Sequence, residues 1–142
     1  MIARTPVYEL MDHTADLGIR VKGKDLIDLF ENGGRALLNL MVRVRSRGKS
    51  VPLSLKVEGN DLPDLMVRWL SEILYLFEGE KVLATSIKIN SLSSTGLEAT
   101  LRTSPYDPRI HEIIREIKAV TYHGIEVIEK KGLWEASIIF DL

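Results

Sequence analysis

The sequence predicts an α+β fold in which two amphipathic helices pack on one largely antiparallel sheet of about six to seven strands. Apolar residues recur at three- and four-residue spacing in segments 26–41 and 61–77, which is typical of helices with one buried face. Apolar and polar residues alternate in segments 51–57 and 133–140, which is typical of half-buried strands. A chain of 142 residues is long enough for one two-layer core. We therefore expect a single domain over residues 1–142.

The remaining elements follow from turn residues and capping residues. Asp25 and Asp61 are good N-caps for the two helices. The adjacent Gly33 and Gly34 indicate either close packing of the first helix or a defect in it. Segment 110–117 fits a helix by its spacing and a strand by its β-branched residues. The predicted strands, in chain order, are 7–11, 17–21, 51–57, a hairpin of 82–90 with 96–103, 118–129 and 133–140.

The composition is that of a soluble globular protein. Apolar residues make up 45% and charged residues 27% of the chain, and 19 basic residues face 20 acidic ones. This balance argues against a stand-alone nucleic-acid-binding protein unless the charges are segregated locally. The absence of cysteine excludes disulfides, thiolate metal ligands and a cysteine nucleophile. Without an apolar leader or a membrane-spanning segment, we expect a cytoplasmic protein.

The two ends of the chain carry the most suggestive group of acids. Asp12, His13 and Asp16 follow the first predicted strand within five residues, and Asp141 precedes the terminal Leu142. If the first and last strands pair, Asp12 or Asp16 meets Asp141 and the α-carboxylate of Leu142. Like charges at such short range repel strongly unless a cation lies between them. The sequence therefore predicts a divalent-metal site closed by the last two residues.

The ligand types narrow the choice of metal. The oxygens of Asp16, Asp141 and the Leu142 carboxylate suit Ca²⁺, Mg²⁺ or Mn²⁺ better than Zn²⁺, and of these we expect Ca²⁺ first. His13 as a further ligand would favour Mn²⁺ or Zn²⁺. The alternatives are that Asp12 is a turn or capping acid and that His13 is a hydrogen-bonded packing residue.

Three other residues could carry chemistry. His111 and His123 are the remaining histidines, but no hydrolase, phosphate-loop or dinucleotide motif accompanies them. Lys118 lies within an apolar segment, so its ammonium group must reach water, a carboxylate or a partner.

A basic run precedes the strand predicted at 51–57. It is either a ribbon that faces a polyanion or a solvated loop that leads into an edge strand, and the second interpretation is the commoner one. Its members are Arg43, Arg45, Arg47 and Lys49.

Three ordered motifs resemble those of the archease family, and together they span essentially the whole chain. Segment 8–19, YELMDHTADLGI, is similar to the opening signature of that family. Segment 117–124, IKAVTYHG, resembles its second motif, and segment 138–142, IIFDL, resembles its ending.

The resemblance implies an accessory protein and not an enzyme. Archeases assist the GTP-dependent RNA ligase (RtcB type) that joins tRNA exon halves, promote guanylylation of the ligase histidine and support multiple turnover. By this resemblance Asp16, Asp141 and the backbone oxygens of Leu142 bind a divalent metal, and Lys118 corresponds to the motif lysine, a candidate for partner contact. The tRNA would be reached only through the ligase.

Two other functions stay open from the residues alone. One is a small metal-dependent phosphohydrolase with Asp16 and Asp141 as ligands and His13 or His123 as base. The purified chain would then hydrolyse phosphoesters without a ligase. The other, which we rank lower, is an RNA-binding module that uses the basic run, because no aromatic stacking residues accompany it.

Overall fold

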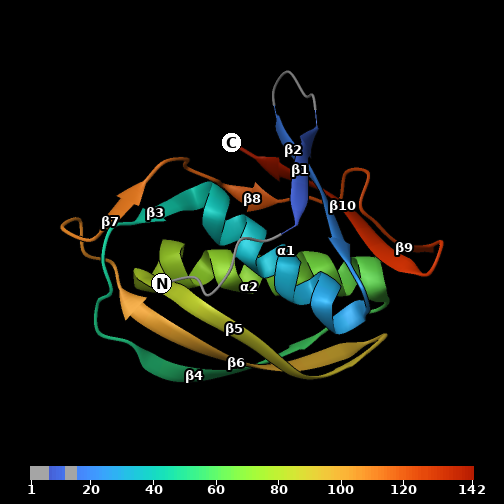
Figure 1. Ribbon diagram of the computed structural model, residues 1–142, viewed down its shortest axis with the longest axis horizontal. Helices are drawn as coiled ribbons and strands as arrows, with labels where there is room; N and C mark the ends of the chain where they lie inside the picture. Colours follow the sequence, from blue (N-terminus) through green and yellow to red (C-terminus); the bar gives the residue numbers. More distant parts are fainter. Residues whose placement is uncertain (1–6, 12–15) are drawn as a thin grey trace.

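The computed structural model describes residues 7–11 and 16–142, with two helices enclosed between two antiparallel sheets (Figure 1). The helices are α1 (Leu26–Met41) and α2 (Leu62–Glu80). The strands are β1 (Tyr8–Met11), β2 (Asp16–Gly23), β3 (Val42–Val44), β4 (Val51–Glu58), β5 (Val82–Ser93), β6 (Gly96–Pro105), β7 (His111–Ile113), β8 (Ala119–Val120), β9 (Glu126–Lys130) and β10 (Leu133–Asp141).

The strands form three sheets, and every pairing is antiparallel. One sheet has the order β1-β2-β10-β8, with β9 also paired to β10; the second is β4-β6-β5; the third is the short pair β3-β7. The α+β class is confirmed, but the expected single sheet of six or seven strands is replaced by two main sheets. The physical reason is that both helices are apolar on more than one side, so each can bury a sheet above and another below.

The core lies where the helices meet the two sheets. Trp69 of α2 is fully buried, and its indole Nε1 donates a hydrogen bond of 2.8 Å to the carbonyl oxygen of Phe30 in α1. The inward face of the first sheet contributes Ile19, Ile138 and Phe140, all with no exposed surface. This core fixes β2 and β10 in register, because a slip of one residue would turn these side chains outward.

The glycine pair in α1 allows close packing and does not interrupt the helix. A Cβ atom at Gly34 would lie 2.7 Å from Cδ1 of Ile87 and 3.0 Å from Cδ1 of Ile73. At Gly33 the nearest atom would be Sδ of Met66, at 3.2 Å. The helix runs unbroken from Leu26 to Met41, so of the two interpretations close packing is confirmed.

Both predicted N-caps are confirmed. The Asp25 carboxylate accepts from the backbone N–H of Asp28 at 2.8 Å, and the Asp61 carboxylate accepts from that of Asp64 at 2.9 Å.

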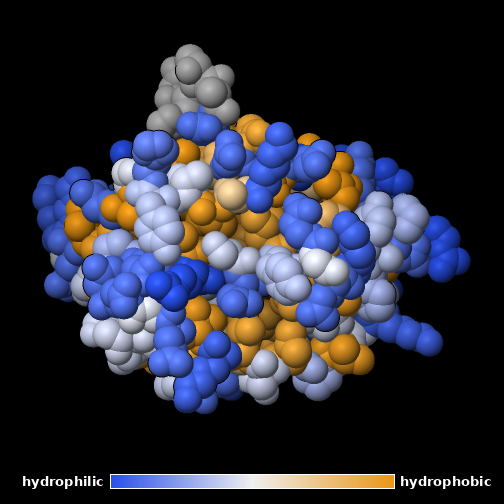
Figure 2. Space-filling model, turned by 180° about the vertical axis from the view of Figure 1, so that it is seen from behind, coloured by the Kyte–Doolittle hydropathy of each residue, from blue (hydrophilic) through white to orange (hydrophobic). Residues whose placement is uncertain are grey.

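Neither helix is long and apolar enough to cross a membrane, within the residues that the structure describes. On the rear face, hydrophobic side chains reach the surface near the middle, with hydrophilic ones around them (Figure 2).

In the C-terminal half the structure corrects one strand prediction and decides one segment that the sequence left open. The single strand expected at 118–129 is instead β8 and β9, separated by a turn in which Gly124 has φ +58°. Segment 110–117 forms no helix: after β7 it continues as irregular chain to β8. The hairpin strands β5 and β6 extend further than expected, so that only residues 94 and 95 separate them.

Candidate metal centre

The first residue of β2 and the last residue of β10 are neighbours. The antiparallel register runs from Trp134 opposite Gly23 to Asp141 opposite Asp16. Residues directly opposite one another in such a pair share a face of the sheet, with Cβ atoms about 5 Å apart. The carboxylates of Asp16 and Asp141 therefore lie side by side at the end of the sheet, where Figure 1 places the C-terminus.

The two acids lie on the face that points away from the helices. On the other face Phe140 is opposite Leu17 and Ile138 is opposite Ile19, both within the packed layer. Because side chains alternate along a strand, Asp16 and Asp141 project to the opposite side. Asp141 is exposed and Asp16 is half-buried, so the pair is open to solvent or to a partner.

The β8 strand flanks the acid pair on its other side. Ala119 is opposite Asp141, and the backbone N–H of Lys118 donates to the Asp141 carbonyl oxygen at 2.8 Å. Lys118 is exposed, so its ammonium group reaches solvent at the same end of the sheet. Leu142 follows directly, is 43% exposed and carries the terminal carboxylate. The structure thus brings Asp16, Asp141, Leu142 and Lys118 to one edge.

The charges and donor atoms at this edge are compatible with a bound cation. Neither Asp16 nor Asp141 forms an ion pair with any residue in 7–11 or 16–142. Like charges directly opposite in a sheet destabilise it. Two carboxylates and a chain terminus form a set of hard oxygen donors of the kind that Ca²⁺, Mg²⁺ and Mn²⁺ prefer. The donor set therefore fits such an ion.

The candidate centre is not a ready-made cage of side chains. Among the described residues, no three His, Cys, Asp or Glu side chains lie close enough together to hold a metal. Within the described residues, the ligands would be the carboxylates of Asp16 and Asp141 and the terminal carboxylate of Leu142. Asp12 and His13, the further candidates, lie outside the described residues. A hard ion with so few protein ligands keeps coordination positions for water or for a partner's oxygens.

A turn next to the candidate centre is tied to α2 by a contact that the sequence did not predict. The Thr121 hydroxyl donates to the Ile139 carbonyl at 2.9 Å, and the Tyr122 hydroxyl donates to Oδ1 of Asp64 at 2.6 Å. This bond from Tyr122 is the main reason that the pKa of Asp64 is lowered, with the N–H of Asn60 and the guanidinium of Arg68 adding to it. The ends of β8 and β10 are thereby braced against the first turn of α2.

Comparison with known proteins shows the family of this chain. The model of the Archease protein family (MTH1598/TM1083) matches residues 8–142. The chain belongs to the archease family. A protein archease of Pyrococcus furiosus is 34% identical over 139 residues, covering 95% of this chain and 98% of the relative. One of Methanosarcina barkeri is 30% identical over 139 residues, covering 95% of each chain.

Two solved structures share the fold. Protein 1598 of Methanobacterium thermoautotrophicum has a TM-score of 0.72 at 30% identity, covering 95% of this chain and 98% of that one. An archease of Thermotoga maritima, described as a possible chaperone, has a TM-score of 0.63 at 18% identity, covering 93% and 94%. The first supports both family and fold, and the second supports the fold alone. The resemblance expected from the three motifs is confirmed.

The remaining histidines of this archease family member do not join the acid pair. His111 lies in the β3-β7 sheet, is 2% exposed, accepts from the Asp107 backbone N–H at Nδ1 (3.0 Å) and stacks on Tyr106. Burial lowers the pKa of His111, so it is a neutral packing residue at pH 7. His123 is exposed in the turn after β8, where its backbone N–H donates to the Thr121 hydroxyl at 3.3 Å.

The basic run is a loop that leads into an edge strand, as the commoner interpretation predicted. Arg43 lies in β3, and residues 45–50 connect it to β4, which is the edge of its sheet. Arg43 and Arg45 both contact Oε1 of Glu112, at 3.3 and 3.0 Å. Two of the four charges are therefore compensated within the chain.

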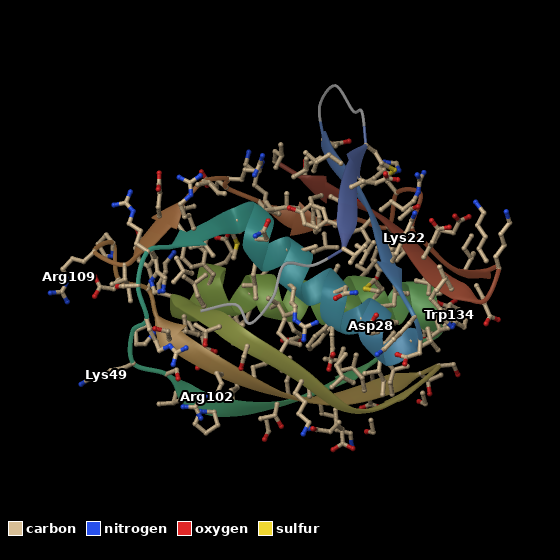
Figure 3. The ribbon with its side chains drawn as sticks, in the orientation of Figure 1. Lys22, Asp28, Lys49, Arg102, Arg109 and Trp134 are labelled. Atoms are coloured by element: carbon tan, nitrogen blue, oxygen red, sulfur yellow. The ribbon has the colours of Figure 1, made fainter. Side chains whose placement is uncertain are left out.

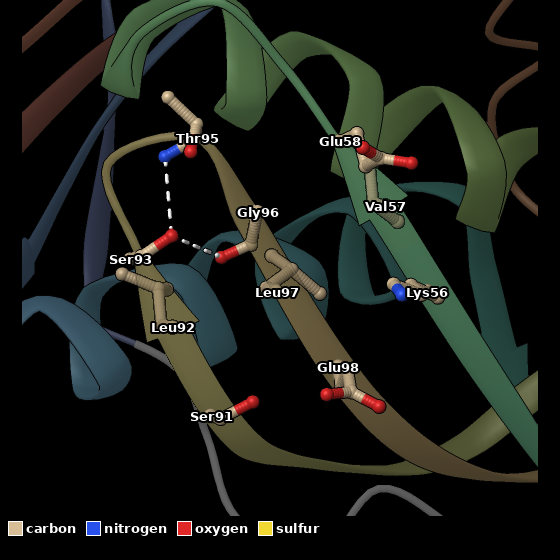
Figure 4. Close-up of a pocket in the computed structure, with 10 residues that line it drawn as sticks. All are labelled: Lys56, Val57, Glu58, Ser91, Leu92, Ser93, Thr95, Gly96, Leu97 and Glu98. Carbon is tan, nitrogen blue, oxygen red and sulfur yellow. Dashed lines mark hydrogen bonds between the residues drawn. The ribbon is translucent and has the colours of Figure 1, made fainter.

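A hollow of about 340 Å³ is lined by residues of β4, β5, β6 and the turn between β5 and β6 (Figure 4). This sheet lies on the other side of the helices from the sheet that carries the acid pair (Figure 1). The Ser93 hydroxyl donates to the Gly96 carbonyl at 3.4 Å and accepts from the Thr95 N–H at 3.3 Å. Among the described residues, neither the acid pair nor a histidine lines this hollow, so it is not the site of the hydrolase alternative, which was built on Asp16 and Asp141.

Proposed function

We propose that this chain is an accessory protein that activates the GTP-dependent tRNA-splicing RNA ligase (RtcB type). In this role it promotes guanylylation of the ligase histidine and multiple turnover. Its place in the archease family supports an assisting role, and the motif residues quoted above support the choice of ligase. It would contact tRNA only through the ligase.

The observation that carries the proposal is the register of Asp141 with Asp16 next to the end of the chain. Asp16, Asp141 and the Leu142 carboxylate would hold a divalent cation, Ca²⁺ first, with Mg²⁺ or Mn²⁺ as alternatives. When bound, such an ion offsets the negative charge of a nucleotide phosphate. Asp12 and His13 remain further candidates for ligation, and Lys118, which is exposed at the same edge, is a candidate for contact with the partner.

The exposure of the acid pair explains why a second protein is needed. Phosphoryl transfer depends on positioning and on a site from which water is excluded. Asp141 and Leu142 are exposed at the end of a sheet, so the rest of the described chain does not shield them from water. A ligase surface docked on this edge would exclude that water, and the chain would supply anionic ligands.

The test is a guanylylation assay of the purified ligase with GTP, with and without this chain. We expect the native chain to accelerate guanylylation and Asp16→Asn or Asp141→Asn to lose most of that acceleration, about tenfold or more, because each removes a charged ligand. The matched control is Glu129→Gln, an exposed acid of β9 in the same sheet, which should activate like the native chain.

Equal activation by all four proteins would contradict the proposal. Metal-dependent hydrolysis of phosphoesters by the chain alone, lost in Asp16→Asn, would instead favour the phosphohydrolase alternative.

A further inference from the structure

A second polar site lies on the β4-β6-β5 sheet, where the loop after β3 crosses the ends of β5 and β6. A cavity of about 200 Å³ is lined there by Arg47, Gly48, Ser50, Thr85, Ser86 and Arg102. Figure 3 shows Lys49, Arg102 and Arg109 at this same end of the molecule. The helices separate this sheet from the one that carries Asp141. The cavity is therefore a separate feature from the candidate metal centre.

The guanidinium of Arg102 is held in the cavity by neutral groups only. Its Nε and Nη2 contact the Ser50 hydroxyl oxygen at 3.1 and 3.0 Å, and Nη2 also donates to the Ser50 carbonyl at 2.9 Å. Within the part of the chain that the structure describes, no carboxylate pairs with Arg102 and Nη1 has no hydrogen-bond partner. Arg102 is thus oriented while its charge is uncompensated.

Two acids at this end of the molecule are paired with arginines outside the cavity. Glu112 pairs with Arg43 and Arg45, and Asp107 pairs with Arg109 at 3.0 Å. Arg47, Lys49 and Arg102 form no ion pair with any residue in 7–11 or 16–142. Uncompensated cations held close together raise the local positive potential, and a bound anion relieves that repulsion.

Hydroxyl groups complete the cavity. The register of β5 with β6 shifts between Ala84 and Ser86, so two consecutive β5 residues, Thr85 and Ser86, reach the cavity. Ser86 is directly opposite Arg102, so the two side chains start from neighbouring positions on the same face of the sheet. Gly48 lets the loop lie close, because a Cβ there would be 2.5 Å from Cδ1 of Ile110.

We propose that this cavity binds a phosphate group, carried by a nucleotide or by RNA. Two guanidinium groups supply a charge that matches a phosphate dianion, and arginine forks fit its oxygens better than lysine does. Ser86 adds a neutral donor for a third oxygen. This site does not depend on the metal centre, so it can fail without affecting the proposed function.

The experiment is a titration of the ¹⁵N-labelled chain with inorganic phosphate, followed by backbone amide shifts at constant ionic strength with chloride as reference. We expect saturable shifts at residues 47–50, 85, 86 and 102. Arg102→Gln should weaken phosphate binding about tenfold, because a charge-assisted hydrogen bond is lost. Arg47→Gln, at an exposed position outside the core, should also weaken phosphate binding.

The matched control is Arg43→Gln, which removes the same charge at the same end but from a side chain already paired with Glu112. It should change the affinity less than about twofold. Shifts no larger than those caused by chloride, or equal losses in Arg43→Gln and Arg102→Gln, would overturn the proposal.

A second titration identifies the source of the phosphate. A short RNA with a 5′-phosphate is compared with the same RNA without it, in the native chain and in Arg102→Gln. Stronger binding of the phosphorylated RNA assigns the cavity to a terminal phosphate, and equal binding that Arg102→Gln weakens assigns it to a backbone phosphate. Either result supports the site, whereas RNA binding that is insensitive to Arg102→Gln contradicts it.

Discussion

The sequence identifies Asp16 and Asp141 as site candidates because Asp16 ends the DHTAD segment after the first strand and Asp141 is the second-last residue, after the last strand. The register of β2 with β10 then makes them neighbours, which only the pairing of distant strands could establish. The sequence did not reveal that Arg102 and Ser50 contact one another, 52 positions apart, or that Tyr122 binds Asp64. Such contacts arise from packing and have no local sequence signal.

His111 shows how burial changes the use of a residue. From sequence it was one of the histidines that could carry chemistry, with no catalytic motif beside it. In the structure it is buried and accepts a hydrogen bond from the chain at Asp107, so its replacement by alanine would disturb the fold. The exposed His123 is the better control position.

The His111 imidazole predicts a pH dependence of stability. Its pKa in the folded chain is lowered from 6.5 by burial, so the unfolded chain takes up the proton first as the pH falls. The stabilisation is complete above about pH 6.5 and is lost as the pH falls toward the folded pKa. We expect the melting temperature to fall between about pH 7 and pH 5.

The matched variants are His111→Asn and His123→Asn, each measured by thermal unfolding across that range. His111→Asn keeps an acceptor for the Asp107 N–H but cannot titrate, so most of the fall should disappear. His123→Asn should retain the native slope. The same slope in all three proteins would show that His111 is not responsible.

At the scale of elements, periodicity predicted both helices and most strands, and it failed where a short turn interrupts an apolar run. Segment 118–129 has the composition of one strand, yet Gly124 at positive φ and the Thr121 hydroxyl bond to Ile139 divide it into β8 and β9. Residue composition reports burial, whereas a turn within an apolar segment is decided by tertiary hydrogen bonds.

The glycine pair of α1 offers a test of close packing. Alanine at a helical glycine gains about 1 kcal/mol in helix propensity. At Gly34 the added methyl would meet Ile87 and Ile73, and overpacking of this kind costs about 1–3 kcal/mol. At Gly33 its one tight contact would be with the flexible thioether of Met66, because Leu70 lies at the ordinary contact distance of 3.7 Å.

We therefore expect Gly34→Ala to be less stable than Gly33→Ala by about 1–2 kcal/mol in chemical denaturation. The two variants make the same chemical change at adjacent positions, so helix propensity cancels between them. Equal stability of the two would show that α1 is not packed as closely as the structure has it.

For the whole molecule, the fold class and the family were predictable, but the arrangement of sheets was not. Binary patterning shows which face of each element is buried, and it does not show which other element covers that face. The helices bury two sheets instead of one, and this sandwich holds β2 and β10 together as its upper layer. The meeting of the two chain ends is therefore a property of the complete fold.

The most direct test of the metal centre is a calorimetric titration of Ca²⁺ into three proteins: the native chain, Asp16→Asn and a chain extended by two glycines after Leu142. The extension leaves every side chain intact but turns the terminal carboxylate into a peptide carbonyl. We expect one site in the native chain, affinity weakened about tenfold or more in both variants, and unchanged melting temperatures without metal. Binding of Ca²⁺ by the extended chain as tightly as by the native chain would contradict a centre built from Asp16, Asp141 and the terminus.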